Sequence, residues 1–190
     1  MLTRLYFVRH AHSIYTPDER QRPLSDKGLL DAEKTTKLLL AENIDYVISS
    51  PYKRAIQTVE GIAKYIGKEI IIEEGFKERK LSEGPVKDFD LAVKKVWDVP
   101  SFSWKGGESN HTAQTRGVHA TIQLLNRFEG KRIVIGTHGN IMVLIMNFFE
   151  KKYNFEFWKE LSMPDIYKLE FEKEKLRTVK RIFEKEILLF

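Results

Sequence analysis

The segment Leu2-Thr3-Arg4-Leu5-Tyr6-Phe7-Val8-Arg9-His10 places a short apolar run directly before a basic pair. Runs of this kind, rich in β-branched or aromatic residues and bounded by polar ones, are typical of buried strands. Three further runs in the chain have the same character, at residues 45–49, 69–73 and 132–137. We therefore expect four strands, the first of them over residues 2–8.

Helical patterns separate these runs. Ser25 is a suitable N-cap for a helix that ends near Asn43, and Ser50-Pro51 is expected to open a second helix that Gly67 closes. Apolar residues in that second segment recur at steps of three and four, as on one face of a helix. Further helices are predicted over residues 118–128, over the wholly apolar stretch 141–149 and, more weakly, near 89–98.

This alternation of strands and helices predicts an α/β fold. We expect a single three-layer α/β/α domain over residues 1–190, with a mostly parallel central sheet. Residues 75–109 are irregular and would form a lid or insertion. Residues 166–171 and 179–183 are expected to form an edge hairpin at the C-terminus.

Composition excludes several classes of protein. The 190 residues contain no cysteine, which rules out disulfide scaffolds, zinc-thiolate sites and thiolate nucleophiles. The formal net charge is +5, but the basic residues are interleaved with acids, so nucleic acid is not the expected partner. The most apolar window, residues 141–149, is too short to span a bilayer. We expect a cytoplasmic protein without a membrane partner, and no pattern fixes its oligomeric state.

Basic residues follow three of the predicted strands. Arg9-His10 follows the first strand, Arg54 lies in the helix after the second, and His138 follows the fourth. Ligands of open α/β sheets bind outside the carboxyl ends of the strands, so these side chains are expected to converge. Guanidinium groups bind phosphoryl oxygens and histidine can attack phosphorus, so the set predicts a phosphoryl site that needs no metal or other cofactor.

Several motifs carry a family resemblance. Residues 5–11 (LYFVRHA) resemble the Arg-His-Gly motif of the histidine phosphatase superfamily, also called phosphoglycerate mutase-like. Residues 23–28 (PLSDKG) resemble its helix entry, and residues 49–58 (SSPYKRAIQT) are similar to its second signature. Residues 106–109 (GGES) resemble a third motif, and the strand before His138 is similar to the one that ends at the second catalytic histidine.

The resemblance implies a two-step reaction. His10 would attack a phosphomonoester, the alcohol would leave, and water would release phosphate from the phosphohistidine. Arg9, Arg54 and a protonated His138 would surround the phosphoryl oxygens, where transition-state charge spreads. The predicted phosphate-binding set also contains Ser13 and Gly139.

The resemblance also implies a carboxylic acid that protonates the leaving oxygen and then activates water. Glu78 is the predicted acid, with Glu83 and Glu108 as alternatives. The chain departs from the family pattern at Ala11, where glycine is usual, and at His12, where Glu or Gln is common. We expect His12 to be exposed.

Four aromatic residues in or near the irregular segment could form an apolar wall beside the leaving group, although core packing is the favoured interpretation: Phe76, Trp97, Phe102 and Trp104. The predicted function is hydrolysis of a small phosphorylated metabolite, with phosphate as a product. Two alternatives are a phosphoglycerate mutase-type isomerase and a low-activity phosphoprotein phosphatase or phospho-ligand binding module. Nucleic-acid binding ranks last, since the basic residues form no stripe with interleaved aromatics.

Overall fold

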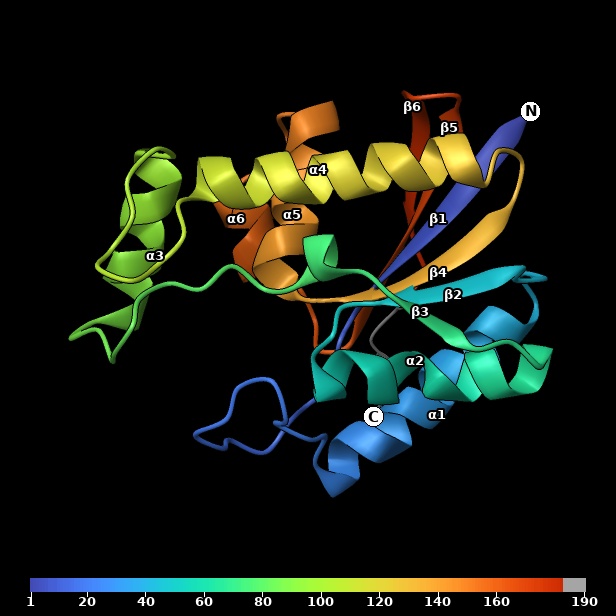
Figure 1. Ribbon diagram of the computed structural model, residues 1–190, viewed down its shortest axis with the longest axis horizontal. Helices are drawn as coiled ribbons and strands as arrows, with labels where there is room; N and C mark the ends of the chain where they lie inside the picture. Colours follow the sequence, from blue (N-terminus) through green and yellow to red (C-terminus); the bar gives the residue numbers. More distant parts are fainter. Residues whose placement is uncertain (183–190) are drawn as a thin grey trace, which may run out of the picture.

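Six strands form the central sheet of the computed structural model, which describes residues 1–182 (Figure 1). Their order is β3-β2-β4-β1-β5-β6. The first four in this order are parallel, and β5 and β6 are antiparallel to their neighbours. The strand bounds are β1 (Leu2–Arg9), β2 (Tyr46–Ser49), β3 (Ile70–Ile72), β4 (Arg132–Thr137), β5 (Asp165–Glu172) and β6 (Lys175–Arg181).

Helices cover both faces of this sheet. In Figure 1, α1 and α2 lie on one face, and α4, α5 and α6 lie on the other. The helix α3 projects beyond the sheet, with irregular segments on either side of it (Figure 1). The helix bounds are α1 (Asp26–Leu40), α2 (Lys53–Ile66), α3 (Phe89–Asp98), α4 (Asn110–Arg127), α5 (Gly139–Phe149) and α6 (Phe155–Lys159), with a 3-10 turn over Glu74–Phe76. The predicted three-layer α/β/α architecture with a mostly parallel sheet is therefore confirmed.

The strand β1 lies at the centre of the core because its side chains are buried on both faces. Leu5 and Phe7 belong to the apolar cluster beneath α4 and α5, whereas Tyr6 and Val8 belong to the cluster beneath α1 and α2. All four side chains have no exposed surface. A strand covered on both faces is continuously apolar rather than alternating, which is why residues 5–8 contain no charged residue.

Local capping residues determine the helix ends, and the structure corrects two of the predicted ends. Ser25 caps α1 as expected, and Gly67 ends α2 with a φ of 65°. The prediction that α2 opens at Ser50-Pro51 was wrong, because α2 begins at Lys53 and the Ser50 hydroxyl lies 2.7 Å from Nε2 of His138. The helix α1 ends at Leu40 rather than near Asn43.

The C-terminal hairpin is also confirmed. It adds β5 to the edge of β1 and β6 to the edge of β5. The last residue of the predicted second strand, residue 183, lies outside the described residues. The helix α6 was not predicted. Within residues 1–182, no helix combines the length and the apolar character needed to cross a bilayer.

Candidate active site

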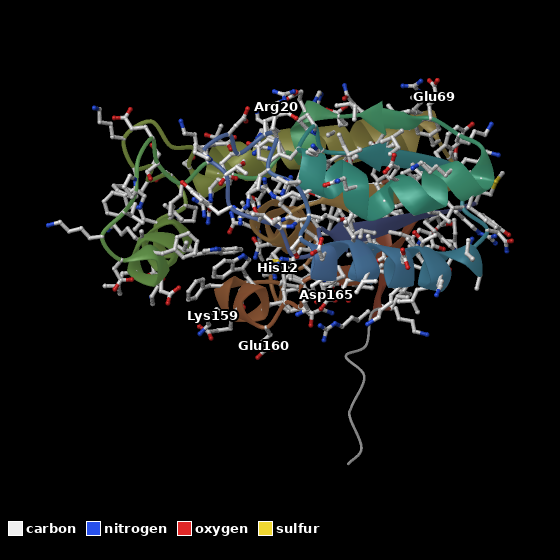
Figure 2. All side chains as sticks on the ribbon, turned by 90° about the horizontal axis from the view of Figure 1, so that it is seen from below. His12, Arg20, Glu69, Lys159, Glu160 and Asp165 are labelled. Carbon is white, nitrogen blue, oxygen red and sulfur yellow. The ribbon has the colours of Figure 1, made fainter. Side chains whose placement is uncertain are left out.

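The carboxyl ends of β1, β2 and β4 meet at one edge of the sheet. Arg9 is the last residue of β1, Arg54 lies in the first turn of α2 after β2, and His138 is the N-cap of α5 directly after β4. Figure 2 looks onto α1 and α2 and shows His12 and Arg20 at this end, with Glu69 at the opposite end. The topology thus brings together the basic residues that the sequence pattern predicted.

His10 presents one ring nitrogen to this site. Its Nδ1 lies 2.8 Å from the carbonyl oxygen of Ala11. Because a carbonyl only accepts hydrogen bonds, Nδ1 carries the proton and Nε2 keeps its lone pair. Nε of Arg54 donates to that lone pair at 3.2 Å. The tautomer of His10 is therefore the one in which Nε2 can act as a nucleophile.

Burial keeps the His10 ring neutral. The side chain is 8% exposed. Burial, reinforced by the positive charge of Arg54, lowers the pKa of His10 to about 3. A neutral imidazole is the nucleophilic form, so its reactive form is populated at every pH above the acid range.

His138 is fully buried beside His10. The rings of His10 and His138 meet edge to face with centroids 5.2 Å apart, and the Tyr52 ring also meets His138 edge to face, at 4.9 Å. Burial, together with the neighbouring His10 and Arg54, holds the pKa of His138 well below its usual value. The protonated His138 expected beside a phosphoryl group would therefore need the negative charge of that group, and it stays a prediction. A neutral His138 still has one N–H to donate.

The two arginines are held by backbone carbonyl groups. Arg9 donates from Nη1 to the carbonyl oxygens of Leu161 at 3.2 Å and Ser162 at 3.1 Å. A Cβ at position 139 would lie 2.9 Å from Nε of Arg9, so glycine is needed there for the arginine to reach the start of α5. Nε of Arg9 is buried and unpaired among the described residues. This N–H is available to an anion.

Arg54 is anchored by the loop between β1 and α1. It donates from Nη1 to the carbonyl oxygen of Glu19 at 2.8 Å, and the Glu19 carboxylate lies 3.3 Å from the same nitrogen. The guanidinium also stacks over the Tyr52 ring, with 4.8 Å between the guanidinium carbon and the ring centroid. These contacts hold Arg54 beside His10 and leave its Nε directed at Nε2 of that histidine.

Glu78 is placed at the N-terminus of α5, next to His138. Its Oε2 accepts from the backbone N–H of Asn140 at 3.1 Å, and its Oε1 accepts from that of Ile141 at 3.0 Å. A helix N-terminus favours a carboxylate through these N–H groups and through its dipole. Glu78 therefore lies at the helix start that directly follows His138.

The two alternative acids are engaged elsewhere. Glu108 binds Arg116 through both carboxylate oxygens, at 2.7 and 2.8 Å. Glu83, which also lines the cavity, pairs with Lys105 at 2.7 Å. Glu78 is thus the one of the three that bonds to the helix bearing His138.

The first loop holds the remaining predicted residues. Ser13 is buried and forms an isolated antiparallel bridge with Leu24. The Ala11 N–H donates to the Thr58 hydroxyl at 3.1 Å, a contact that sequence reasoning missed. His12 is exposed as expected. Its Nδ1 lies 2.8 Å from the hydroxyl of Ser25, so its side chain contacts the N-cap of α1.

A cavity of 830 Å³ opens over the site. Arg54, Glu78 and Tyr52 line it, together with Tyr15 and Trp158. The four aromatic residues singled out in the sequence do not line this cavity among the described residues, and Phe76 packs on Phe7 in the core. Core packing, the favoured interpretation, is therefore confirmed for Phe76. Residues 1–182 contain no cluster of three or more His, Asp or Glu side chains suited to a metal ion.

Comparison with known proteins identifies one family for this chain. The sequence model described as "Histidine phosphatase superfamily (branch 1)" matches residues 5–183. Phosphoserine phosphatase 1 of Hydrogenobacter thermophilus is 28% identical over 153 residues, covering 72% of this chain and 71% of that protein. Phosphoglycerate mutase-like protein 4 of Arabidopsis thaliana is 28% identical over 155 residues, covering 71% and 66%.

Solved structures share the fold. The structure of Bacillus stearothermophilus YhfR superposes with a TM-score of 0.78 at 24% identity, covering 92% of this chain and 94% of that one. For four curated relatives, the matched part of this chain spans 59 to 71% of the relative's length.

Proposed function

The chain belongs to the histidine phosphatase superfamily, branch 1, and from this premise we propose that it is a metal-independent phosphomonoester hydrolase that works through a phosphohistidine at His10. The observation that carries this proposal is the state of His10. Its Nδ1 is fixed by the Ala11 carbonyl, and its Nε2 is unprotonated, with a lone pair that accepts from Nε of Arg54 at 3.2 Å until a phosphoryl group takes that place. A buried, neutral and oriented imidazole is what nucleophilic attack on phosphorus requires.

In the first step, Nε2 of His10 forms a bond to phosphorus while the bond from phosphorus to the ester oxygen breaks. Glu78, as the carboxylic acid, transfers its proton to the departing oxygen, so the product leaves as a neutral alcohol. The resulting carboxylate is stabilised by the N–H groups of Asn140 and Ile141. In the second step, Glu78 takes a proton from water, the water oxygen bonds to phosphorus, and the bond from phosphorus to nitrogen breaks.

Positive charge around the phosphoryl group lowers the barrier of both steps. The uncommitted N–H of Arg9 is a preorganised donor for the equatorial oxygens. Nε of Arg54, which here donates to His10, and one N–H of His138 are proposed to donate to the same oxygens when the phosphoryl group is bound. Donors that are already oriented and desolvated favour the transition state more than the ground state. The backbone at Gly139, and Ser13 in the first loop, are proposed to contact the same oxygens.

The substrate is proposed to be a small phosphorylated metabolite. The cavity of 830 Å³ suits a small molecule beyond the phosphoryl group. Phosphoryl isomerisation of the mutase type is the alternative, favoured by one observation, namely the phosphoglycerate mutase-like name of the Arabidopsis relative. Comparing 3-phosphoglycerate interconversion with phosphate release distinguishes the two, because faster interconversion would assign the isomerase.

The first test is release of p-nitrophenol from p-nitrophenyl phosphate in excess EDTA. We expect turnover by the wild-type protein and a loss of about a thousandfold or more in His10→Ala, because removal of a nucleophile abolishes the covalent route. The matched control is His12→Ala, which removes the neighbouring but exposed histidine and should change kcat by less than about threefold.

Acid-labile labelling of the protein by a phosphorylated substrate should accompany turnover and should disappear in His10→Ala. Hydrolysis that requires a metal ion, or that persists without His10, would overturn the mechanism. Turnover and labelling that are both absent from the wild-type protein would favour the binding-module alternative.

A further inference from the structure

The hydroxyl group of Ser50 is a buried contact of His138 that the proposed mechanism does not use. Its Oγ lies 2.7 Å from Nε2 of His138, and neither residue has any exposed surface. Ser50 directly follows β2 and His138 directly follows β4, and these two strands are parallel neighbours in the sheet. Because neither side chain reaches bulk solvent, each proton in this contact needs a partner within the protein.

The hydroxyl proton of Ser50 has a single acceptor within the part of the chain that the structure describes. The backbone N–H of Tyr52 donates to Oγ of Ser50 at 3.3 Å, and a donor of this kind cannot accept a proton. The remaining neighbour of the hydroxyl is Nε2 of His138. When Nε2 accepts this proton, the ring of His138 is neutral and its own proton lies on Nδ1.

The other neutral tautomer of His138 leaves more groups unpaired. Nδ1 of His138 is buried and has no hydrogen-bond partner among the described residues. With the ring proton on Nε2, both the hydroxyl proton of Ser50 and the lone pair of Nδ1 would be buried without a partner. With the ring proton on Nδ1, that N–H alone is unpaired. Because unpaired buried polar groups are costly, the contact favours the Nδ1–H tautomer.

A doubly protonated His138 fits this contact poorly. Nε2 would then donate to Oγ of Ser50, which already accepts from a backbone N–H, and the hydroxyl proton would lose its acceptor. Burial also opposes the positive ring, and so do the neighbouring basic groups. The titratable and charged groups around the ring are His10, Arg9, Arg54 and Arg116, together with the Glu78 carboxylate at the start of α5.

We propose that Ser50 is a positioning residue that holds His138 as the neutral Nδ1–H tautomer, and that this N–H donates to the phosphoryl group. The role rests on the proposed function, because it assigns the atom through which His138 acts in that reaction. Nε of Arg9 is a second buried N–H without a partner among the described residues at the same edge of the sheet. Two donors that are desolvated and fixed before the substrate arrives are suited to stabilise developing charge on the phosphoryl oxygens.

Nitrogen-15 NMR of the histidine rings measures which nitrogen of His138 carries the proton. The full chain is labelled at the ring nitrogens, and the signals of His138 are identified by their loss in His138→Gln. We expect a protonated Nδ1 and an unprotonated Nε2 near neutral pH, both in the free protein and in the presence of saturating inorganic phosphate. Phosphate should shift the Nδ1–H signal, because that N–H gains an anionic acceptor.

Ser50→Ala removes the hydroxyl group that accounts for the tautomer. We expect the Nε2–H tautomer of His138 to become populated and kcat/KM for p-nitrophenyl phosphate to fall about tenfold or more, because the donating nitrogen then lacks its proton. Ser50→Cys, which has a similar size but a weaker donor, should give an intermediate loss. A merely structural role of Ser50 would lower the melting temperature of the variants without changing which nitrogen is protonated.

The matched control is Ser49→Ala. Ser49 is as fully buried as Ser50, but its hydroxyl donates to the Ser50 carbonyl at 2.9 Å rather than to His138. This variant should keep the Nδ1–H tautomer and change kcat/KM by less than about threefold. Thermal melting checks that every variant folds. If Ser50→Ala does not fold, Ser50→Cys and the NMR measurement on the wild-type protein still decide the question.

Three results would overturn the inference: a proton on Nε2 of His138 in the free wild-type protein, a doubly protonated His138 once phosphate is bound, or an unchanged tautomer in both Ser50 variants. Failure of the proposed function is a separate result. If the wild-type protein does not hydrolyse p-nitrophenyl phosphate, that function fails. The NMR spectra of the free protein and of its Ser50 variants then still show whether Ser50 holds the tautomer of His138.

Discussion

At the scale of single residues, burial determines the chemistry of the site. His10 and His138 have adjacent rings, yet each has a different partner, the Ala11 carbonyl for one and the Ser50 hydroxyl for the other. Both are kept neutral by desolvation and by nearby positive charge. The same positive charge that would bind a phosphoryl group thus also keeps the proposed nucleophile, His10, unprotonated.

This neutrality makes the folded state sensitive to acid. Because the pKa of His10 falls from about 6.5 in the unfolded chain to about 3 in the fold, the unfolded state binds more protons between these values. The contribution of neutral His10 to the free energy of unfolding is therefore fully present above about pH 6.5, and it is lost as the pH falls toward 3. We expect His10 to account for about 2 kcal/mol of lost unfolding free energy between pH 6.5 and pH 5.

Urea denaturation at several pH values measures this effect. His10→Asn should show a shallower decline of stability over the same interval than the wild-type protein. His119→Asn is the control, because His119 is exposed on α4 and should leave the slope unchanged. Parallel curves for the wild type and His10→Asn would mean that His10 is not buried as a neutral ring.

At the scale of elements, the helix N-termini position the site. The first turn of α5 binds Glu78 and lies against Arg9, whereas the first turn of α1 packs on the loop that follows His10. At that second contact the Ser25 N–H donates to the His12 carbonyl at 3.0 Å. A Cβ at Gly28 would lie 2.0 Å from the same carbonyl oxygen. The helix can approach the loop this closely only because position 28 has no side chain.

Gly28→Ala should therefore destabilise the fold by about 1 to 3 kcal/mol, because the added methyl group meets backbone that cannot move independently. Chemical denaturation gives the value. The control is Gly84→Ala, where a Cβ would have no neighbour within 4 Å and the expected change is within about 0.5 kcal/mol. Equal effects of the two substitutions would show that α1 tolerates a wider separation from the loop.

At the scale of the whole molecule, the C-terminal hairpin supports Arg9 from the far end of the chain. Asp165, the first residue of β5, has no exposed surface and binds Arg181 of β6 through both oxygens, at 2.9 and 2.8 Å. Asp165 also accepts from the Ser162 N–H at 2.8 Å. The carbonyl group of Ser162 in turn accepts from Arg9. Figure 2 shows Asp165 near Lys159 and Glu160, close to the end at which His12 lies.

Arg181→Met should weaken this support. The substitution leaves the buried Asp165 carboxylate without its cation. We expect the free energy of unfolding to fall by about 1 to 3 kcal/mol. This loss is smaller than for a fully buried ion pair, because Arg181 is partly exposed. The KM for p-nitrophenyl phosphate should rise as well, since the segment that anchors Arg9 loosens.

Arg177→Met is the matched control. Its ion pair with Glu172 is exposed on both sides, so stability should change by about 0.5 kcal/mol or less and KM should not change. A rise of KM in Arg177→Met equal to that in Arg181→Met would assign the effect to net charge rather than to the hairpin.

Local patterns in the sequence determined much of this protein. The apolar run before Arg9-His10, the Ser25 cap and the Gly67 stop each depend on residues within one strand or one helical turn. These features predicted the alternation of strands and helices and the convergence of Arg9, His10, Arg54 and His138, because parallel strands end at one edge of a sheet.

Contacts between distant residues were decided only by the tertiary structure. The anchoring of Arg9 at Leu161, the bond from Asn140 to Glu78 and the contact of Ser50 with His138 join positions that no local period relates. The neutral state of His138 likewise depends on complete burial beside His10. Desolvation and hydrogen-bond partners are properties of the packed neighbourhood, so the charge and orientation of the site residues became defined only when the sheet and its helices were assembled.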